Sequence, residues 1–185
     1  MDIVAHGLWT FVVVYVLSQW KLTARYFNTR KKLAAAVIAG FSIDLLFAPQ
    51  FFYFLTHSAS RDFHATAFPG WMVTWYWINH NYFFIAIIGL IVFLLFRGYT
   101  VPVVFALTLH VTMDIFTHKG FFELAPFWPI QQAPFHGLVS WAQPTFFKWS
   151  WITLLAVFLL VFLHMQYQKR KSLISKHKKS KDFLV

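Results

Sequence analysis

Residues 82–96 read YFFIAIIGLIVFLLF and carry no charged side chain. Such a run cannot face water, so it needs lipid or a protein interior around it. The same bias runs through the whole chain, of which 59% is hydrophobic and 12% is charged. Soluble domains carry about 25% charged residues, so too few charges are present here to coat a water-facing surface. The composition therefore predicts an integral membrane protein.

Five segments are apolar enough to serve as membrane spans, because a bilayer core of about 30 Å needs about 20 largely apolar helical residues. They are residues 4–19, 33–55, 82–96, 99–116 and 149–165. The first lacks a positively charged start and a cleavage motif, so we expect it to be retained as a helix. The sequence thus predicts an all-α, polytopic bundle of about five transmembrane helices over residues 1–168, with a basic tail over residues 169–185.

The Lys and Arg residues predict the orientation of this bundle. Thirteen of the sixteen follow the first, third or fifth segment. Cytoplasmic ends carry the excess of Lys and Arg, so we expect the N-terminus outside and the C-terminus in the cytoplasm. The basic tail is expected to lie near anionic lipid headgroups, and nucleic acid is not an expected partner. Two connections rich in aromatic residues and proline, residues 56–81 and 117–148, then fall outside.

Two acids stand inside these apolar segments, where a charged side chain marks a candidate functional site. Asp44 lies near the middle of the second segment, and Asp114 lies near the outer end of the fourth. His110 and Asp114 are four residues apart and share one helix face. His6 opens the first segment from outside and His80 immediately precedes the third. The predicted topology brings these residues to similar depths, with Asp44 somewhat deeper.

Mixed imidazole and carboxylate donors suit zinc, with manganese or iron as alternatives. The predicted metal ligands are His6, Asp44, His80, His110 and Asp114, and either acid could instead accept a proton as a catalytic base. A simpler alternative is a hydrogen bond between His110 and Asp114 that only holds helices together. The remaining outer histidines are expected to be loop or interface residues: His57, His64, His118 and His136.

Residues 110–120, HVTMDIFTHKG, followed by Phe127-Trp128-Pro129, resemble the H-x-x-x-D-x-x-T-x-x-G…W-P signature of the YdjM-like (DUF457) inner-membrane proteins. The opening residues 1–6, MDIVAH, resemble the early histidine of that family. Residues 40–44, GFSID, resemble its G-x-x-P-D element, and residues 79–81, NHN, stand where it has T-H-S. This chain departs from the pattern, because Ile43 replaces the proline, Leu46 replaces a second acid, and Asn79 and Asn81 replace Thr and Ser.

The resemblance implies a metal-dependent hydrolase in a bacterial plasma (inner) membrane. A metal there would lower the pKa of a bound water towards about 7 and polarise an ester. A site beside the headgroups makes a lipid phosphoester the expected substrate class. Neither a G-x-S-x-G motif nor a phosphate-binding glycine loop occurs in the sequence. Three alternatives stay open: a carrier or channel for a metal ion or proton, a haem-binding protein, and a structural membrane partner.

Overall fold

The computed structural model describes residues 3–46, 48–57, 69–131 and 133–182. Within these ranges the chain forms α-helices and short 3-10 turns, with one isolated β-bridge between Leu124 and Phe135. The predicted all-α class is therefore confirmed. The helices are α1 (Ile3–Gln19), α2 (Lys21–Phe27), α3 (Arg30–Leu45), α4 (Ala48–His57), α5 (Gly70–Asn79), α6 (Tyr82–Phe96), α7 (Thr100–Thr117) and α8 (Pro144–Asp182), and the 3-10 turns are η1 (Arg97–Tyr99) and η2 (Gly120–Phe122).

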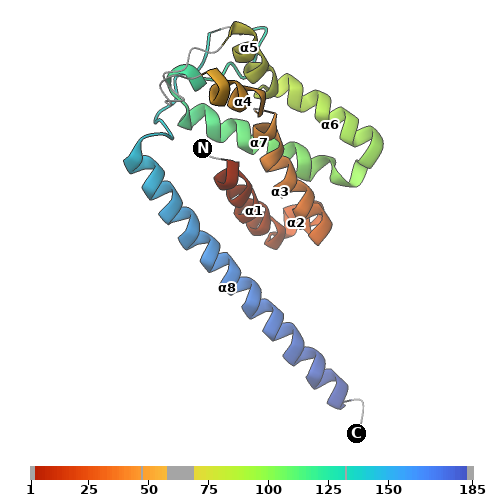
Figure 1. The fold of residues 1–185 in the computed structure, drawn as a ribbon. Coiled ribbons are helices and arrows are strands. Elements are labelled where there is room, and N and C mark those ends of the chain that lie inside the picture. The colour runs from red at the N-terminus through yellow and green to blue at the C-terminus, as the bar shows by residue number, and fades with distance from the viewer. Residues whose placement is uncertain (1–2, 47, 58–68, 132, 183–185) are drawn as a thin grey trace.

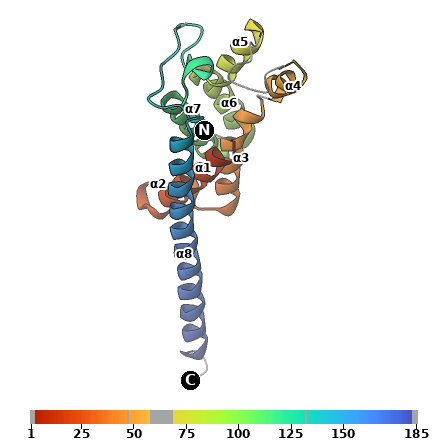
Figure 2. The same cartoon turned by 60° about the vertical axis from the view of Figure 1, so that its left-hand side comes forward.

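Helix α7 is the centre of the packed part of the molecule, where it contacts α1, α3 and α6. Helices α6 and α7 run side by side and are joined by the turn η1 (Figure 1). Helix α8 packs against α1, and its C-terminal half extends past the other helices (Figures 1 and 2). The result is a small bundle with one long helix attached to its side.

Two glycines bring α1 and α3 into close contact. A Cβ atom on Gly7 would lie 2.0 Å from the ring of Phe41, and one on Gly40 would lie 2.5 Å from the hydroxyl of Thr10. Real side chains do not approach so closely, so each glycine leaves room for a residue of the other helix. This contact sets the first turn of α1 beside the last turns of α3.

The second predicted span, residues 33–55, is wrong as a single helix, because α3 ends at Leu45 and α4 begins at Ala48. Pro49 stands in the first turn of α4, where proline is tolerated, whereas it would interrupt the hydrogen bonds of a continuous helix. Helix α5 was not expected either, and it begins directly after Pro69. Helix α8 is longer than the fifth predicted span, because it begins at Pro144 and continues through the predicted basic tail as far as Asp182.

Two helical stretches are long and apolar enough to cross a membrane, residues 82–117 and 144–171. The first contains α6, η1 and α7, and it folds back on itself at η1 (Figure 1). Large apolar side chains on both stretches point outward, among them Leu90 and Leu94 of α6 and Leu159 and Leu163 of α8. Apolar side chains arranged in this way are suited to contact with lipid.

Replacing Gly7 by Ala should destabilise the contact between α1 and α3, because the added methyl group overlaps the Phe41 ring. Overpacking of this kind costs about 1–3 kcal/mol, so the melting temperature in detergent should fall by several degrees. Gly98→Ala is the matched control, since a Cβ at that position meets nothing within 4 Å. Equal melting temperatures for the two variants would contradict the proposed close contact.

Candidate metal centre

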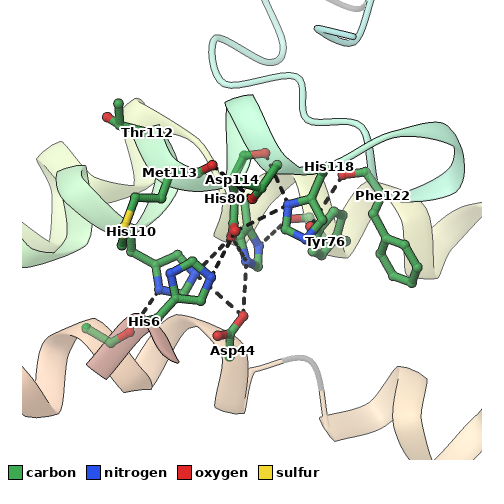
Figure 3. Close-up of polar contacts among 12 residues, drawn as sticks. His6, Asp44, Tyr76, His80, His110, Thr112, Met113, Asp114, His118 and Phe122 are labelled. Carbon is green, nitrogen blue, oxygen red and sulfur yellow. Dashed lines mark hydrogen bonds and ion pairs between the residues drawn. The ribbon is translucent and has the colours of Figure 1, made fainter. Parts of the chain in front are cut away.

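Five predicted site residues meet at one end of the bundle (Figure 3). His6 lies in the first turn of α1, and Asp44 lies in the last turn of α3. His80 caps the C-terminus of α5, while His110 and Asp114 lie one turn apart on α7. All are buried apart from Asp44, whose side chain keeps 15% of its surface exposed. Three helices and the C-terminal cap of α5 therefore supply this cluster; the sequence predicts that these residues come together but does not predict α5.

The acids and the imidazoles face one another directly. Nε2 of His110 lies 3.1 Å from Oδ2 of Asp114 and 3.5 Å from Oδ1 of Asp44. Nε2 of His80 lies 3.8 Å from Oδ1 of Asp44 and 3.9 Å from Oδ2 of Asp114. One ligand atom from each of these four residues lies within 4.8 Å of all the others, and the group could hold a metal ion. Zinc bonds of 2.0–2.1 Å place ligand atoms roughly 3.4 Å apart, so small shifts would close the set around an ion.

Backbone carbonyls orient the two central imidazoles. Nδ1 of His110 lies 2.8 Å from the carbonyl oxygen of Gly40, and Nδ1 of His80 lies 3.1 Å from that of Tyr76. When Nδ1 of each ring donates a hydrogen bond to its carbonyl, Nε2 of the same ring keeps a lone pair that faces the acids. Histidine ligands of metals usually have such a partner for the second ring nitrogen. The arrangement therefore presents Nε2 of both rings as donors to a cation.

Several polar atoms of the cluster make no hydrogen bond to the described part of the chain. They include Nε2 of His80, Nε2 of His110 and Oδ2 of Asp44. The 3.1 Å contact between His110 and Asp114 is within ion-pair distance but lacks hydrogen-bond alignment. Leaving such groups buried and unsatisfied is costly. The His110–Asp114 contact joins two residues of α7 and leaves Asp44 and His80 unsatisfied, whereas a shared cation would satisfy all four residues.

Two further histidines contact Asp114. Nε2 of His6 lies 2.9 Å from Oδ1 of Asp114, and the His6 ring stacks on His110 with centroids 3.9 Å apart. Nδ1 of His118 lies 3.3 Å from the same Oδ1. The expectation that His118 is a loop residue away from the site is wrong, because its side chain is buried beside Asp114. Burial lowers the pKa of His118 to about 3, so this imidazole is neutral.

Tyr76 is a site residue that sequence reasoning missed. Its ring lies against His80 with centroids 4.3 Å apart, and its hydroxyl lies 3.5 Å from the carbonyl oxygen of Phe122. Burial, together with the nearby carboxylates of Asp114 and Asp44, raises the pKa of Tyr76 well above its usual value. The hydroxyl therefore keeps its proton. The spacing of four between Tyr76 and His80 on α5 was the available signal, but no helix was expected there.

The connection after α7 folds over the cluster. The amide of Gly137 donates to the carbonyl oxygen of His118 at 3.0 Å, and the indole of Trp77 donates to that of Glu123 at 3.0 Å. A Cβ on Gly137 would lie 2.2 Å from the same His118 oxygen, so the position requires glycine. These contacts exclude water from one side of the centre.

The other outer histidines lie elsewhere. His57 is exposed and stacks on Tyr53 with centroids 4.2 Å apart. The side chain of His136 is 83% exposed and pairs with Glu123 at 2.8 Å. The expectation that both stand outside the site is confirmed, whereas His64 lies outside the described residues.

No family model, curated protein or solved structure matches this chain. Its functional interpretation therefore depends on the cluster itself. The chain is therefore a helical protein whose buried Asp44, His80, His110 and Asp114 could hold a metal ion.

Removing a ligand should remove the metal. We expect His110→Ala and Asp114→Ala each to lower the metal content of the purified protein to about half or less, since loss of one ligand leaves the donors of its site too few. Elemental analysis of the protein in detergent measures this directly. His57→Ala is the control, because its exposed ring lies outside the cluster. Equal metal content in all three variants would rule out a metal centre here.

Proposed function

We propose that this chain is a multi-pass membrane protein that hydrolyses a lipid phosphoester at a metal centre near the outer leaflet. The observation that carries the proposal is the convergence of Asp44, His80, His110 and Asp114 within 4.8 Å. Two acids so close together repel each other unless a cation or protons intervene. Mixed carboxylate and imidazole donors are the ligand set of zinc hydrolases. The resemblance to the YdjM-like family agrees with this chemistry.

The proposed topology has five spans, formed by α1, α3, α6, α7 and α8. The helix ends at which the site residues lie support this topology. His6 begins α1, Asp44 ends α3, His80 precedes α6 and Asp114 ends α7. Helices that alternate in direction bring these four ends to one side, and the excess of Lys and Arg assigns the opposite side to the cytoplasm. The metal centre then lies at the outer face.

The shorter helices fit a membrane only with some adjustment. Helix α6 has 15 residues and spans about 22 Å, at 1.5 Å per residue. A bilayer core measures about 30 Å, so the lipid would have to thin beside α6. Thinning would bring phosphate headgroups towards the buried cluster, which suits a lipid substrate.

In the proposed mechanism the chain holds the metal through Asp44, His80, His110 and Asp114. A divalent cation bound at this centre would supply a Lewis acid and would lower the pKa of a water held there. Asp44 is the partly exposed member, and its Oδ2 makes no hydrogen bond to any described residue. With Oδ1 of Asp44 on the metal, Oδ2 of the same carboxylate would remain to accept the proton of the attacking water. Tyr76 lies against His80 with its ring and helps to position that imidazole.

A groove beside the cluster could hold the acyl part of a lipid. It lies between α1, α7 and α8, measures about 360 Å³ and has a mostly apolar lining. It is lined by Trp9, Met113, Phe146, Trp149, Ser150 and Thr153. Trp9 is one turn from His6, and Met113 immediately precedes Asp114. An acyl chain in this groove would keep its headgroup near the metal centre.

The test is release of phosphate or headgroup from vesicles of anionic phospholipid by the reconstituted, zinc-loaded protein. Wild type should turn over, and activity should fall at least about 100-fold in Asp44→Ala and His110→Ala, because metal ligation and proton transfer are both lost. His57→Ala should retain activity. Bound metal without turnover on any phospholipid would exclude the hydrolase.

The second candidate is a carrier or binding protein for a metal ion or proton. The near-complete burial of the site favours it, since His110 and Asp114 have no exposed side-chain surface. A buried acid pair in a membrane is also typical of ion paths. Metal flux into liposomes without ester hydrolysis would support this alternative over the first.

The topology can be tested with single cysteines, because the chain has none of its own. We expect Ile130→Cys, at an 81% exposed position in the connection before α8, to react with a membrane-impermeant maleimide from outside intact cells. Lys31→Cys, at the start of α3, should react only after the cells are permeabilised. Reaction of both from the same side would overturn the proposed orientation.

A further inference from the structure

The carboxylate of Asp114 presents its two oxygens to different groups of side chains (Figure 3). Oδ2 faces Nε2 of His110 at 3.1 Å and Nε2 of His80 at 3.9 Å. Oδ1 faces Nε2 of His6 at 2.9 Å and Nδ1 of His118 at 3.3 Å. The first group is the one that can hold a metal ion together with Asp44. The second group lies on the other oxygen of the same carboxylate.

His6 gives an independent sign that something binds at Oδ1. Its side chain has no exposed surface, Nε2 faces Oδ1 of Asp114 at 2.9 Å, and Nδ1 has no hydrogen-bond partner among the described residues. A buried imidazole with an unsatisfied nitrogen is costly, and a cation between Nε2 and the carboxylate would bind both. The His6 ring is stacked on His110, with centroids 3.9 Å apart and planes inclined by 22°.

We propose that Asp114 bridges two divalent cations, and that His6, His118 and Oδ1 of Asp114 form the second site. This inference rests on the proposed function, because it adds a cation to the same centre. For His118 to coordinate through Nδ1, its proton must lie on Nε2. Nδ1 also lies 3.2 Å from the backbone oxygen of Asp114, so the competing tautomer would donate there instead.

The two metal sites would differ in the number of coordination positions that the protein leaves open. The first has four protein ligands, Asp44, His80, His110 and Asp114, which complete a tetrahedral zinc site. The second has three and leaves a position for water or for a phosphate oxygen of the substrate. Two cations on one carboxylate can stabilise both the attacking and the leaving oxygen of a phosphoester. The second site would therefore hold the water that attacks the ester.

The experiment measures metal stoichiometry. The full-length protein in detergent is stripped with a chelator, loaded with Mn²⁺, desalted and analysed for manganese per chain. We expect two ions in wild type and one in His6→Ala and in His118→Asn. Electron paramagnetic resonance should show an exchange-coupled pair in wild type and a mononuclear signal in both variants. His57→Ala should keep two coupled ions, and circular dichroism verifies that each variant remains helical.

The outcomes separate this inference from the proposed function. One ion in wild type, retained in both variants, would overturn the second site and leave the proposed metal centre intact. No ion in wild type would overturn both. A helical His118→Asn variant that lost both ions would also count against it, because the first site would then depend on His118.

Discussion

The proximity of two carboxylates inside an apolar bundle is the constraint around which this molecule is built. Asp44 and Asp114 come from helices far apart in the sequence, yet each lies within 4 Å of the same imidazole nitrogens. Like charges at this separation, away from water, are strongly unfavourable. Their approach is tolerable only because imidazoles, and in our interpretation a cation, stand between them. If a cation occupies the centre, its binding and the folding of the bundle are coupled energetically.

Close backbone contacts between the surrounding helices hold the acids and imidazoles of the cluster in place. Gly40 makes two contributions: its missing side chain leaves room for Thr10, and its carbonyl oxygen accepts a hydrogen bond from Nδ1 of His110. On α5 the carbonyl oxygen of Tyr76 accepts a hydrogen bond from Nδ1 of His80. The metal-facing nitrogens are thus fixed by main-chain atoms, which hold a ring more rigidly than flexible side chains would. The precision of the centre comes from helix packing rather than from the loop above it.

The sequence was informative where one physical rule dominates. The apolar runs predict the helices, and the cost of a buried acid singles out Asp44 and Asp114. Spacing of four residues links His110 to Asp114, and the same spacing continues to His118, although the neighbouring Lys119 suggested a loop. The break between α3 and α4 and the existence of α5 were missed, because short amphipathic or aromatic helices lack a long apolar run. Tyr76 was missed with them, since its position depends on α5.

The length of α8 has a mechanical consequence. Its 39 residues measure about 58 Å at 1.5 Å per residue, nearly twice the thickness of a hydrocarbon core of about 30 Å. In the proposed topology, a helix of this length that enters the bilayer at the outer face continues past the cytoplasmic surface. The rest of α8 would then stand clear of the lipid as a rigid extension of the last span.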